Sequence, residues 1–200
     1  MTVATNRKLT VQEYLTYADG SDTRYELVDG DLVPMSLGTG KHGKITKFLE
    51  KALDAEILRS GYTWTAERFS IGVQSPRGTR WDTCRIPDVV VVTLEQWQEL
   101  QSREAVIALN QPPPILVIEV VSASTINDDY RAKRAEYSVL DIPEYWIVDP
   151  LQNKVTVCTL HEGLYDLEEF QGSALLVSLI FPNLQLTADQ VLNTGQSGEE

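Results

Sequence analysis

One stretch constrains the fold more than any other, an apolar run from Ile115 to Val121 that only Glu119 interrupts. The run is dense in β-branched residues, and a run this apolar is typical of a strand that is buried on both faces of a sheet. Burying a carboxylate in such a strand is unfavourable unless a cation or hydrogen-bond donors meet it. The sequence therefore predicts a core strand with one acid that needs a partner.

The residues after this strand predict a helix over Asp128–Leu140. Asp129, Lys133 and Tyr137 stand at positions i, i+4 and i+8 of that helix, so their side chains share one face. A carboxylate in a core strand, followed by a helix that carries a lysine, is what we expect of half of a metal-dependent active site.

The chain has 200 residues, which predicts a single domain with its core at residues 9–192 and a polar tail at 193–200. An apolar content of 42% and a charged content of 23% favour the soluble globular class. No apolar run approaches the roughly 20 residues that cross a bilayer, and the N-terminus lacks the apolar segment of a secretory signal. We therefore expect a cytoplasmic protein without a membrane partner, with Cys84 and Cys158 as reduced thiols.

The net charge is −12, from 29 acidic and 17 basic residues. Proteins that depend on many phosphate contacts usually carry a basic surface, so this balance argues against a protein that coats DNA. It leaves room for an enzyme with a local basic patch or a metal ion at its site.

The other segments predict a mixed sheet with helices packed on it, an α/β (mixed α+β) fold. Helices are predicted at Thr10–Ala18, Lys41–Ser60 and Ala188–Leu192, and the predicted helix Asp128–Leu140 takes Asn127 or Thr125 as its N-cap. Strands are predicted within Tyr62–Val73 and at Arg85–Thr93, Tyr145–Asp149, Leu175–Ile180 and Leu184–Leu186. Hairpins are predicted at Arg24–Met35 around Asp29–Gly30 and at Lys154–Phe170, with a turn region at Ser75–Thr83 and a weak helix or lid within Thr93–Ala108.

Four basic residues crowd the first turns of the predicted helix at 41–60: Lys41, His42, Lys44 and Lys47. Cations at a helix N-terminus oppose the helix dipole, so their placement indicates an anionic ligand or, equally, a solvated basic start.

Asp88 stands at the start of one predicted core strand and Glu119 inside another. If the two strands are neighbours, both carboxylates can bind one Mg²⁺ or Mn²⁺ ion, with the Val120 carbonyl as a further oxygen ligand. Lys133 would then orient or deprotonate an attacking water, or stabilise charge on a phosphate.

Several segments, in this order, carry a resemblance to a known family: Arg24–Gly30 with Leu32-Val33, His42, Pro87–Val91, Glu119–Ser122 with Ser124-Thr125, the Asp129/Lys133/Tyr137 helix and Ile142–Pro150. Together they resemble the Uma family of restriction endonucleases (DUF820-like), within the PD-(D/E)XK nuclease superfamily. The resemblance covers most of the chain, from about Leu9 to Leu192. It implies a restriction-endonuclease-like fold, a central mixed sheet flanked by helices.

The resemblance also implies roles for individual residues. Asp88 would be the first acid of the motif and Glu119 the second, while Val121 stands where the motif has its lysine. Lys133 on the following helix is the natural substitute for that lysine. Glu26 and His42 match positions at the edge of the site. Glu26 would act as an additional ligand or bind a metal water, and His42 would hold a phosphate or relay a proton.

Each of these residues also has a structural interpretation. Asp88 would cap a turn after a proline, Lys133 would be one more solvated cation, and Glu26 an ordinary strand carboxylate. The aromatic residues of the predicted helix and of the strand after it would be core or interface residues: Tyr130, Tyr137, Tyr145 and Trp146. Zinc sites, nucleotide-binding loops and serine-hydrolase elbows are disfavoured, because the sequence lacks their motifs.

The prediction is therefore an Mg²⁺-dependent or Mn²⁺-dependent endonuclease that hydrolyses phosphodiester bonds, with DNA as the expected substrate. The alternative is a nuclease fold retained as a weakly active or inactive binding or assembly module. We also expect a homodimer, because apolar segments such as Val155–Leu160 and Leu175–Ile180 would otherwise leave exposed sheet edges.

Overall fold

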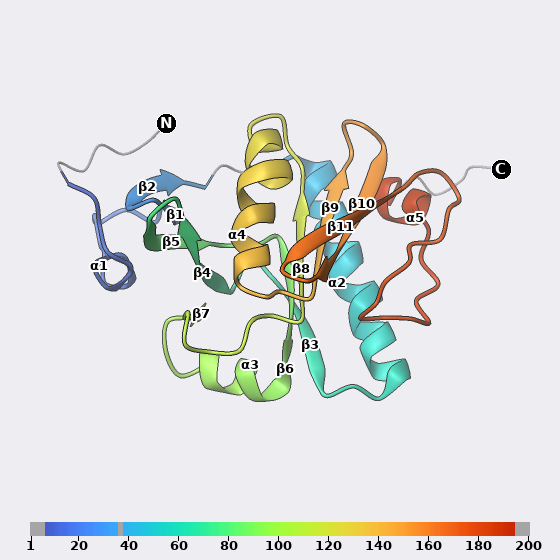
Figure 1. Ribbon diagram of the computed structural model, residues 1–200, viewed down its shortest axis with the longest axis horizontal. Helices are drawn as coiled ribbons and strands as arrows, with labels where there is room; N and C mark the ends of the chain where they lie inside the picture. The colour runs from blue at the N-terminus through green and yellow to red at the C-terminus, as the bar shows by residue number, and fades with distance from the viewer. Residues whose placement is uncertain (1–6, 36–37, 195–200) are drawn as a thin grey trace.

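Two β-sheets form the framework of the computed structural model, which describes residues 7–35 and 38–194 (Figure 1). Within these residues the larger sheet has six strands in the order β11-β10-β9-β8-β6-β3. It is mixed, because β8 and β9 are parallel and the other neighbours are antiparallel. Its strands are β3 (Trp64–Arg68), β6 (Val89–Thr93), β8 (Leu116–Val120), β9 (Glu144–Asp149), β10 (Lys154–His161) and β11 (Leu164–Phe170).

The smaller sheet lies beside the larger one and has the order β2-β1-β5-β4-β7. Its strands are β1 (Tyr25–Val28), β2 (Asp31–Pro34), β4 (Gly72–Arg77), β5 (Arg80–Arg85) and β7 (Val106–Ile107). The hairpin predicted around Asp29–Gly30 is confirmed, since both residues have positive φ (49° and 79°), as a two-residue hairpin turn requires.

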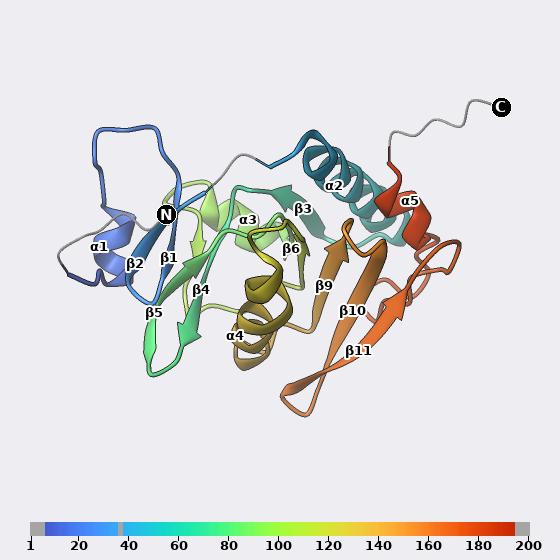
Figure 2. The same cartoon turned by 90° about the horizontal axis from the view of Figure 1, so that it is seen from above.

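Helices cover both faces of the larger sheet. Figure 2 shows α2 on one side of the strands and α4 on the other. The helices are α1 (Val11–Leu15), α2 (Gly40–Ser60), α3 (Leu94–Leu100), the π-helix η1 (Asp128–Lys133), α4 (Arg134–Val139) and α5 (Ala188–Leu192). The predicted fold class, a mixed α/β arrangement with helices flanking the sheet, is confirmed.

The β8 strand is buried along its whole length, as its apolar sequence predicts. Its residues alternate between two cores, because neighbouring side chains of a strand point to opposite faces. Leu116, Ile118 and Val120 pack with α2, whereas Val117 and Val121 pack on the side of α4. Glu119 shares the parity of Val117, so its side chain also points toward the α4 side.

The α2 helix begins and ends where its sequence indicates. Thr39 accepts a hydrogen bond from the His42 backbone N–H as N-cap, and Gly61 ends the helix with φ 71°. Ile45, Leu49 and Leu53 recur at helical spacing and are fully buried against the sheet. This packing fixes the first turn of α2 beside the ends of β6 and β8.

Some predicted elements are wrong. The region Ser75–Thr83, predicted as a turn, belongs mostly to β4 and β5, because the register shift between Ser75 and Arg77 accommodates Pro76 within the strand. Leu175–Ile180 forms no strand, and Leu175 makes only an isolated bridge to Thr187. Asn127 makes no side-chain capping bond, since the helical turn already begins at Ile126.

Three further predictions concern surface, thiols and termini. The homodimer was predicted in part from apolar residues expected to be exposed in the hairpin at 154–170. Val155 and Val157 of that hairpin are buried, so this part of the argument is wrong. Cys84 and Cys158 are free buried thiols, as predicted. Among residues 7–35 and 38–194, no helix combines the length and the apolarity that crossing a membrane requires. The predicted tail lies mostly outside the described residues.

Candidate active site

Asp88 and Glu119 meet at one edge of the larger sheet. In the antiparallel ladder of β6 and β8, Val89 faces Ile118 and Val90 faces Val117. One further step of this ladder brings Asp88 opposite Glu119. Directly opposed residues of an antiparallel pair project to the same face, so the two carboxylates, 31 residues apart in the sequence, project from neighbouring strands.

Asp88 is held by the end of β8 and by the start of α2. Its Oδ2 accepts a hydrogen bond of 2.6 Å from the Val120 backbone N–H and lies 3.1 Å from His42 Nε2. Burial lowers the pKa of His42, but the hydrogen bond and the negative charge of Asp88 more than offset this, so the pKa lies above its usual value. These contacts bring together three residues that the sequence analysis selected.

The ring of His42 fits its place closely. It stacks on Phe69 with 5.9 Å between ring centroids. A Cβ on Gly38 would lie only 2.8 Å from His42 Nδ1, so the glycine leaves the space that the ring needs. The glycine-rich connection before α2 therefore has a local function, which is to let His42 lie against Asp88.

Glu119 lies under the following helix, as the sequence predicts. Its Oε1 accepts a hydrogen bond of 2.9 Å from the Tyr137 hydroxyl, and its Oε2 lies 2.8 Å from Lys133 Nζ. The side chains of Glu119 and Lys133 are only 4% and 7% exposed. The predicted shared face of Asp129, Lys133 and Tyr137 is therefore confirmed, and it points at the core-strand acid.

Asp129 is a third carboxylate in this cluster. Its Oδ1 lies 3.0 Å from Lys133 Nζ, and the residue is 1% exposed. Neither carboxylate oxygen has a partner with hydrogen-bond geometry among the described residues. Asp129 and Lys133 both belong to η1, and π-helical turns are rare and frequently occur at functional sites. A buried carboxylate with so few donors is costly unless positive charge is nearby.

The cluster holds more negative than positive charge, and the pKa values reflect this. Burial raises the pKa of Glu119 to about 8; the Lys133 ammonium opposes this rise, and the charges of Asp88 and Asp129 add to it. Burial alone lowers the pKa of Lys133, but the Glu119 and Asp129 carboxylates more than offset it, so this pKa lies above its usual value. Lys133 therefore remains an ammonium, in contact with the carboxyl groups of Glu119 and Asp129.

Glu26 lies at the edge of the cluster and is bound by other groups. Its Oε1 accepts a hydrogen bond of 2.9 Å from the Ile86 backbone N–H, and its Oε2 lies 3.2 Å from Arg85 Nη1. The same buried guanidinium binds Glu136 through two hydrogen bonds, of 2.8 and 3.0 Å. Within the described part of the chain, no hydrogen bond or ion pair joins Glu26 to Asp88 or Glu119, but its charge acts on both Glu119 and Lys133.

Sequence reasoning missed two parts of this arrangement. Asp129 was expected on the face of Lys133 but not as a site residue, although the i, i+4 spacing to Lys133 was a usable signal. The Arg85–Glu136 pair gave no signal, because these residues lie 51 positions apart and meet only through packing of β5 on α4. Across residues 7–35 and 38–194, no group of three or more His, Cys, Asp or Glu side chains is arranged as a ready metal site.

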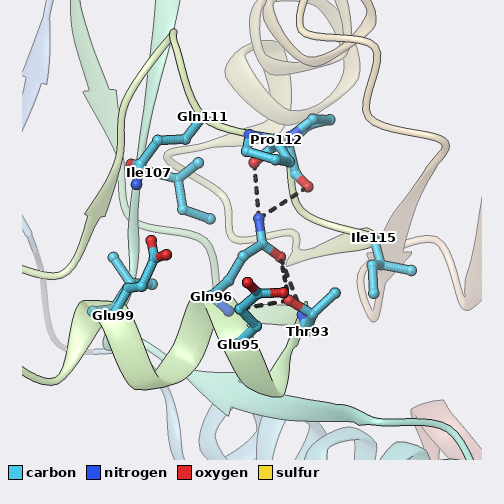
Figure 3. Close-up of a pocket in the computed structure, with 10 residues that line it drawn as sticks. Thr93, Glu95, Gln96, Glu99, Ile107, Gln111, Pro112 and Ile115 are labelled. Carbon is cyan, nitrogen blue, oxygen red and sulfur yellow. Dashed lines mark hydrogen bonds between the residues drawn. The ribbon is translucent and has the colours of Figure 1, made fainter.

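A pocket of about 410 Å³ lies away from these acids (Figure 3). It is lined by α3 and the segment before β8, at the opposite ends of β6 and β8 from Asp88 and Glu119. Its central Gln96 is engaged in local structure, because its side chain accepts a bond from the Thr93 backbone N–H and donates one to the Pro112 carbonyl, as Figure 3 shows. The pocket lies apart from Asp88 and Glu119 and is not part of the candidate site.

Comparisons with known proteins show which family and fold the chain shares. The chain resembles the crystal structure of a "putative nuclease belonging to DUF820" from Anabaena variabilis, with a TM-score of 0.69 and 17% identity, over 92% of this chain and 98% of that one. It is also 26% identical over 150 residues to the "Uncharacterized protein sll1609" of Synechocystis sp., covering 74% of this chain and 79% of the relative. The sequence model of the Uma2 family, described as "Putative restriction endonuclease", matches residues 11–189. Because this match spans most of the sequence, the chain belongs to the Uma2 family.

Proposed function

We propose that this protein is a metal-dependent endonuclease that hydrolyses phosphodiester bonds in DNA. The observation that carries the proposal is the meeting of Asp88 and Glu119 on neighbouring strands, with Lys133 Nζ 2.8 Å from Glu119. The family description and the fold of the Anabaena protein support the same class of reaction.

The residues of the site fit a hard divalent cation such as Mg²⁺ or Mn²⁺. Mg²⁺ prefers oxygen ligands and is commonly bound through one or two carboxylates together with waters and substrate phosphates. The surplus of carboxyl groups over ammonium groups, and the absence of further donors to Asp129 beyond the Lys133 ammonium among the described residues, favour an added positive charge. Asp88, Glu119 and the Val120 carbonyl would hold the cation. When bound, it would supply Lewis-acid activation of the phosphate and of a water.

The pKa of Lys133 defines what its side chain can do. A group that remains an ammonium donates hydrogen bonds and cannot accept a proton. We therefore assign Lys133 to stabilising negative charge that develops on the phosphate, and not to deprotonating the attacking water. Asp129 and Tyr137 are positioning residues, because each contacts a member of the Glu119–Lys133 pair.

His42 contacts Asp88 from the first turn of α2 and is about 15% exposed at its side chain. Hydrogen bonding to Asp88 raises the pKa of His42 although burial lowers it, which favours the charged ring that would donate to a phosphate oxygen. We assign His42 to holding the substrate phosphate at the cation side of the site. Glu26, bound by Arg85, acts on the site through its charge.

The test is cleavage of labelled single-stranded, duplex and branched DNA by the purified protein with Mg²⁺, with Mn²⁺ and with a chelator. Wild type should cut at least one substrate in a metal-dependent manner, and Asp88→Asn should be inactive while it keeps the circular dichroism of wild type. Absence of cleavage of every substrate, or equal cleavage by wild type and Asp88→Asn, would overturn the proposal.

A second candidate is a nuclease fold that serves as a binding or assembly module. The observation in its favour is the mutual contact of Glu119 and Lys133, since an internally neutralised pair has less need of a cation. Calorimetric titration with Mn²⁺ separates the two candidates. Uptake that is lost in Asp88→Asn favours the nuclease, and the absence of uptake by wild type favours the module.

We also propose a homodimer. Leu164 and Leu167 on β11, which ends the larger sheet, are exposed, as are Val177 and Leu179 on the neighbouring loop. An edge strand with exposed apolar side chains is a surface that another copy can cover. A monomeric mass by light scattering at micromolar concentration would contradict this proposal.

A further inference from the structure

The lysines of the chain fall into two groups. The sequence contains seven, and four of them lie on α2: Lys41, Lys44, Lys47 and Lys51. The three others each contact carboxylates: Lys8 pairs with Asp29 and Asp31, Lys133 with Glu119 and Asp129, and Lys154 with Glu169. The four on α2, here called the α2 lysine row, are all exposed, and no described residue forms an ion pair or hydrogen bond with them.

The acidic residues of α2 do not neutralise this row, because each has a different partner. Glu50 binds Arg68 at 2.9 Å, and Glu56 binds Arg59 in the last turn of the helix. Asp54 accepts a hydrogen bond from the Ala66 backbone N–H. No ion pair therefore joins the α2 lysine row to the acidic residues of its own helix, although the protein has a net charge of −12.

The length of the α2 lysine row fits a polymeric anion better than a small one. With 3.6 residues per turn, its four positions occupy about a third of the helix circumference. At 1.5 Å per residue the row is about 15 Å long, which matches about four phosphates of one DNA strand at an axial spacing of 3.4 Å. A single phosphate cannot contact both ends of it.

The row starts at the candidate active site. Lys41 precedes His42, whose ring lies 3.1 Å from Asp88. From there α2 runs along the outer side of the sheet, on the face opposite α4 (Figure 2). A strand bound along the row would therefore reach the edge of the sheet where His42 contacts Asp88.

We propose that the α2 lysine row binds the phosphate backbone of the nucleic-acid substrate and guides it toward Asp88 and Glu119. The proposal rests on the proposed function in taking a nucleic acid as the ligand. A membrane surface fits less well, because a helix that lies on a membrane presents a continuous apolar face beside its lysines, whereas Ile45, Leu49 and Leu53 are buried in the core and Leu58 is the one large apolar side chain of α2 that is exposed.

The experiment measures binding without cleavage. Fluorescence anisotropy of a labelled duplex and of a labelled single strand is recorded with the full chain in the presence of a chelator, at several salt concentrations. The variant Lys44→Gln/Lys47→Gln should bind about tenfold more weakly at low salt. The slope of log K against log salt should become less steep by about 1.4 to 1.8, because two phosphate contacts are lost.

A charge-matched control comes from elsewhere on the surface. Lys8→Gln/Arg59→Gln removes the same two positive charges, from residues that already pair with carboxylates. It should leave the affinity within about twofold and the slope unchanged. Equal losses in both double variants would overturn the proposal, because general charge would then explain the binding, and so would wild-type affinity in Lys44→Gln/Lys47→Gln.

Two further measurements, vesicle binding and DNA cleavage, distinguish DNA binding by the α2 lysine row from membrane binding and from the proposed endonuclease activity. Co-sedimentation with vesicles that contain anionic lipid should show no binding that depends on the row; lysine-dependent vesicle binding without DNA binding would overturn the proposal. Cleavage is scored separately. A protein that binds DNA through the row but never cuts it contradicts the proposed endonuclease and leaves the binding surface supported, whereas cleavage with unaltered binding in Lys44→Gln/Lys47→Gln contradicts only the binding surface.

Discussion

Two buried glutamates on the parallel strands β8 and β9 have opposite surroundings. Glu144 is fully buried, and it accepts hydrogen bonds from neutral donors: the Trp146 indole at 2.6 Å, the Ser178 hydroxyl at 2.7 Å and the backbone N–H groups of Leu179 and Ile180 at 2.7 and 3.3 Å. Glu119 is 3% exposed, and it meets the Tyr137 hydroxyl, the Lys133 ammonium and the charges of three further carboxylates.

The difference between the two surroundings distinguishes a buried carboxylate with a structural role from one suited to binding a cation. The donors around Glu144 satisfy both of its oxygens, and they attach the segment 178–180 to β9, which is a structural role. The groups around Glu119 leave an excess of negative charge, which stabilises the fold poorly and favours a cation. The two positions lie toward opposite ends of the paired strands, since Glu144 faces Leu116 and Glu119 faces Ile147.

The largest expected effect is on cleavage. Glu119→Gln should lower the rate of metal-dependent cleavage by about 100-fold or more, because it removes a ligand charge at the reacting phosphate. Glu144→Gln should leave the rate per folded molecule within about twofold. Rates measured with active-site-normalised protein check this contrast, and a comparable loss in both variants would remove the distinction between the two glutamates.

Stability should show the reverse order. Glu144→Gln turns an NH₂ group toward donors that need an acceptor, so the free energy of unfolding should fall by about 2–3 kcal/mol. For a chain of this size that corresponds to about 2–4 °C in melting temperature for each kcal/mol. Chemical denaturation of the metal-free protein measures it. Should Glu119→Gln be the more destabilised variant under these conditions, the structural assignment of Glu144 fails.

Metal affinity tests the contribution of Asp129. Asp129→Asn keeps the shape of the side chain and removes one negative charge from the cluster, so it should weaken Mn²⁺ binding by about tenfold. Isothermal titration calorimetry gives the affinity, and Glu168→Gln on the exposed face of β11 provides a control with the same change of net charge. Unchanged affinity in Asp129→Asn would exclude Asp129 from the site.

The smallest effect concerns pH. The folded-state pKa values of Glu119 and Asp129 are raised, chiefly by burial, so the stability that these two groups contribute to the metal-free protein is fully present only below their ordinary pKa values near 4. The protein should lose stability as pH rises through the folded pKa of Glu119, about 8. With a chelator present, the melting temperature should therefore fall as the pH is raised from 5 to 8. Glu119→Gln should flatten this slope and Glu168→Gln should not; a slope that rises with pH would contradict the raised pKa values.

Much of the fold was predictable because the signals are local. The hairpin turn at Asp29–Gly30, the 3.6-residue period of α2 with Gly61 at its end, and the buried run of β8 each depend on neighbouring residues. The errors fall where tertiary contacts override local preference. Pro76 lies inside a strand at a register shift, and Leu175–Ile180 stays irregular because its backbone is held by Glu144 instead of by a sheet partner.

The candidate site likewise has a part that local sequence predicted and a part that depends on tertiary contacts. The sequence by itself determined which chemical groups are present: an acid after Pro87, an acid inside an apolar strand, and a lysine at helical spacing from Asp129. Only the tertiary structure decided that β6 lies beside β8, that Lys133 contacts Glu119, and that Arg85 binds Glu26 away from the two acids. The physical reason is that strand order and helix packing depend on burying apolar faces across the whole chain, which no local segment encodes.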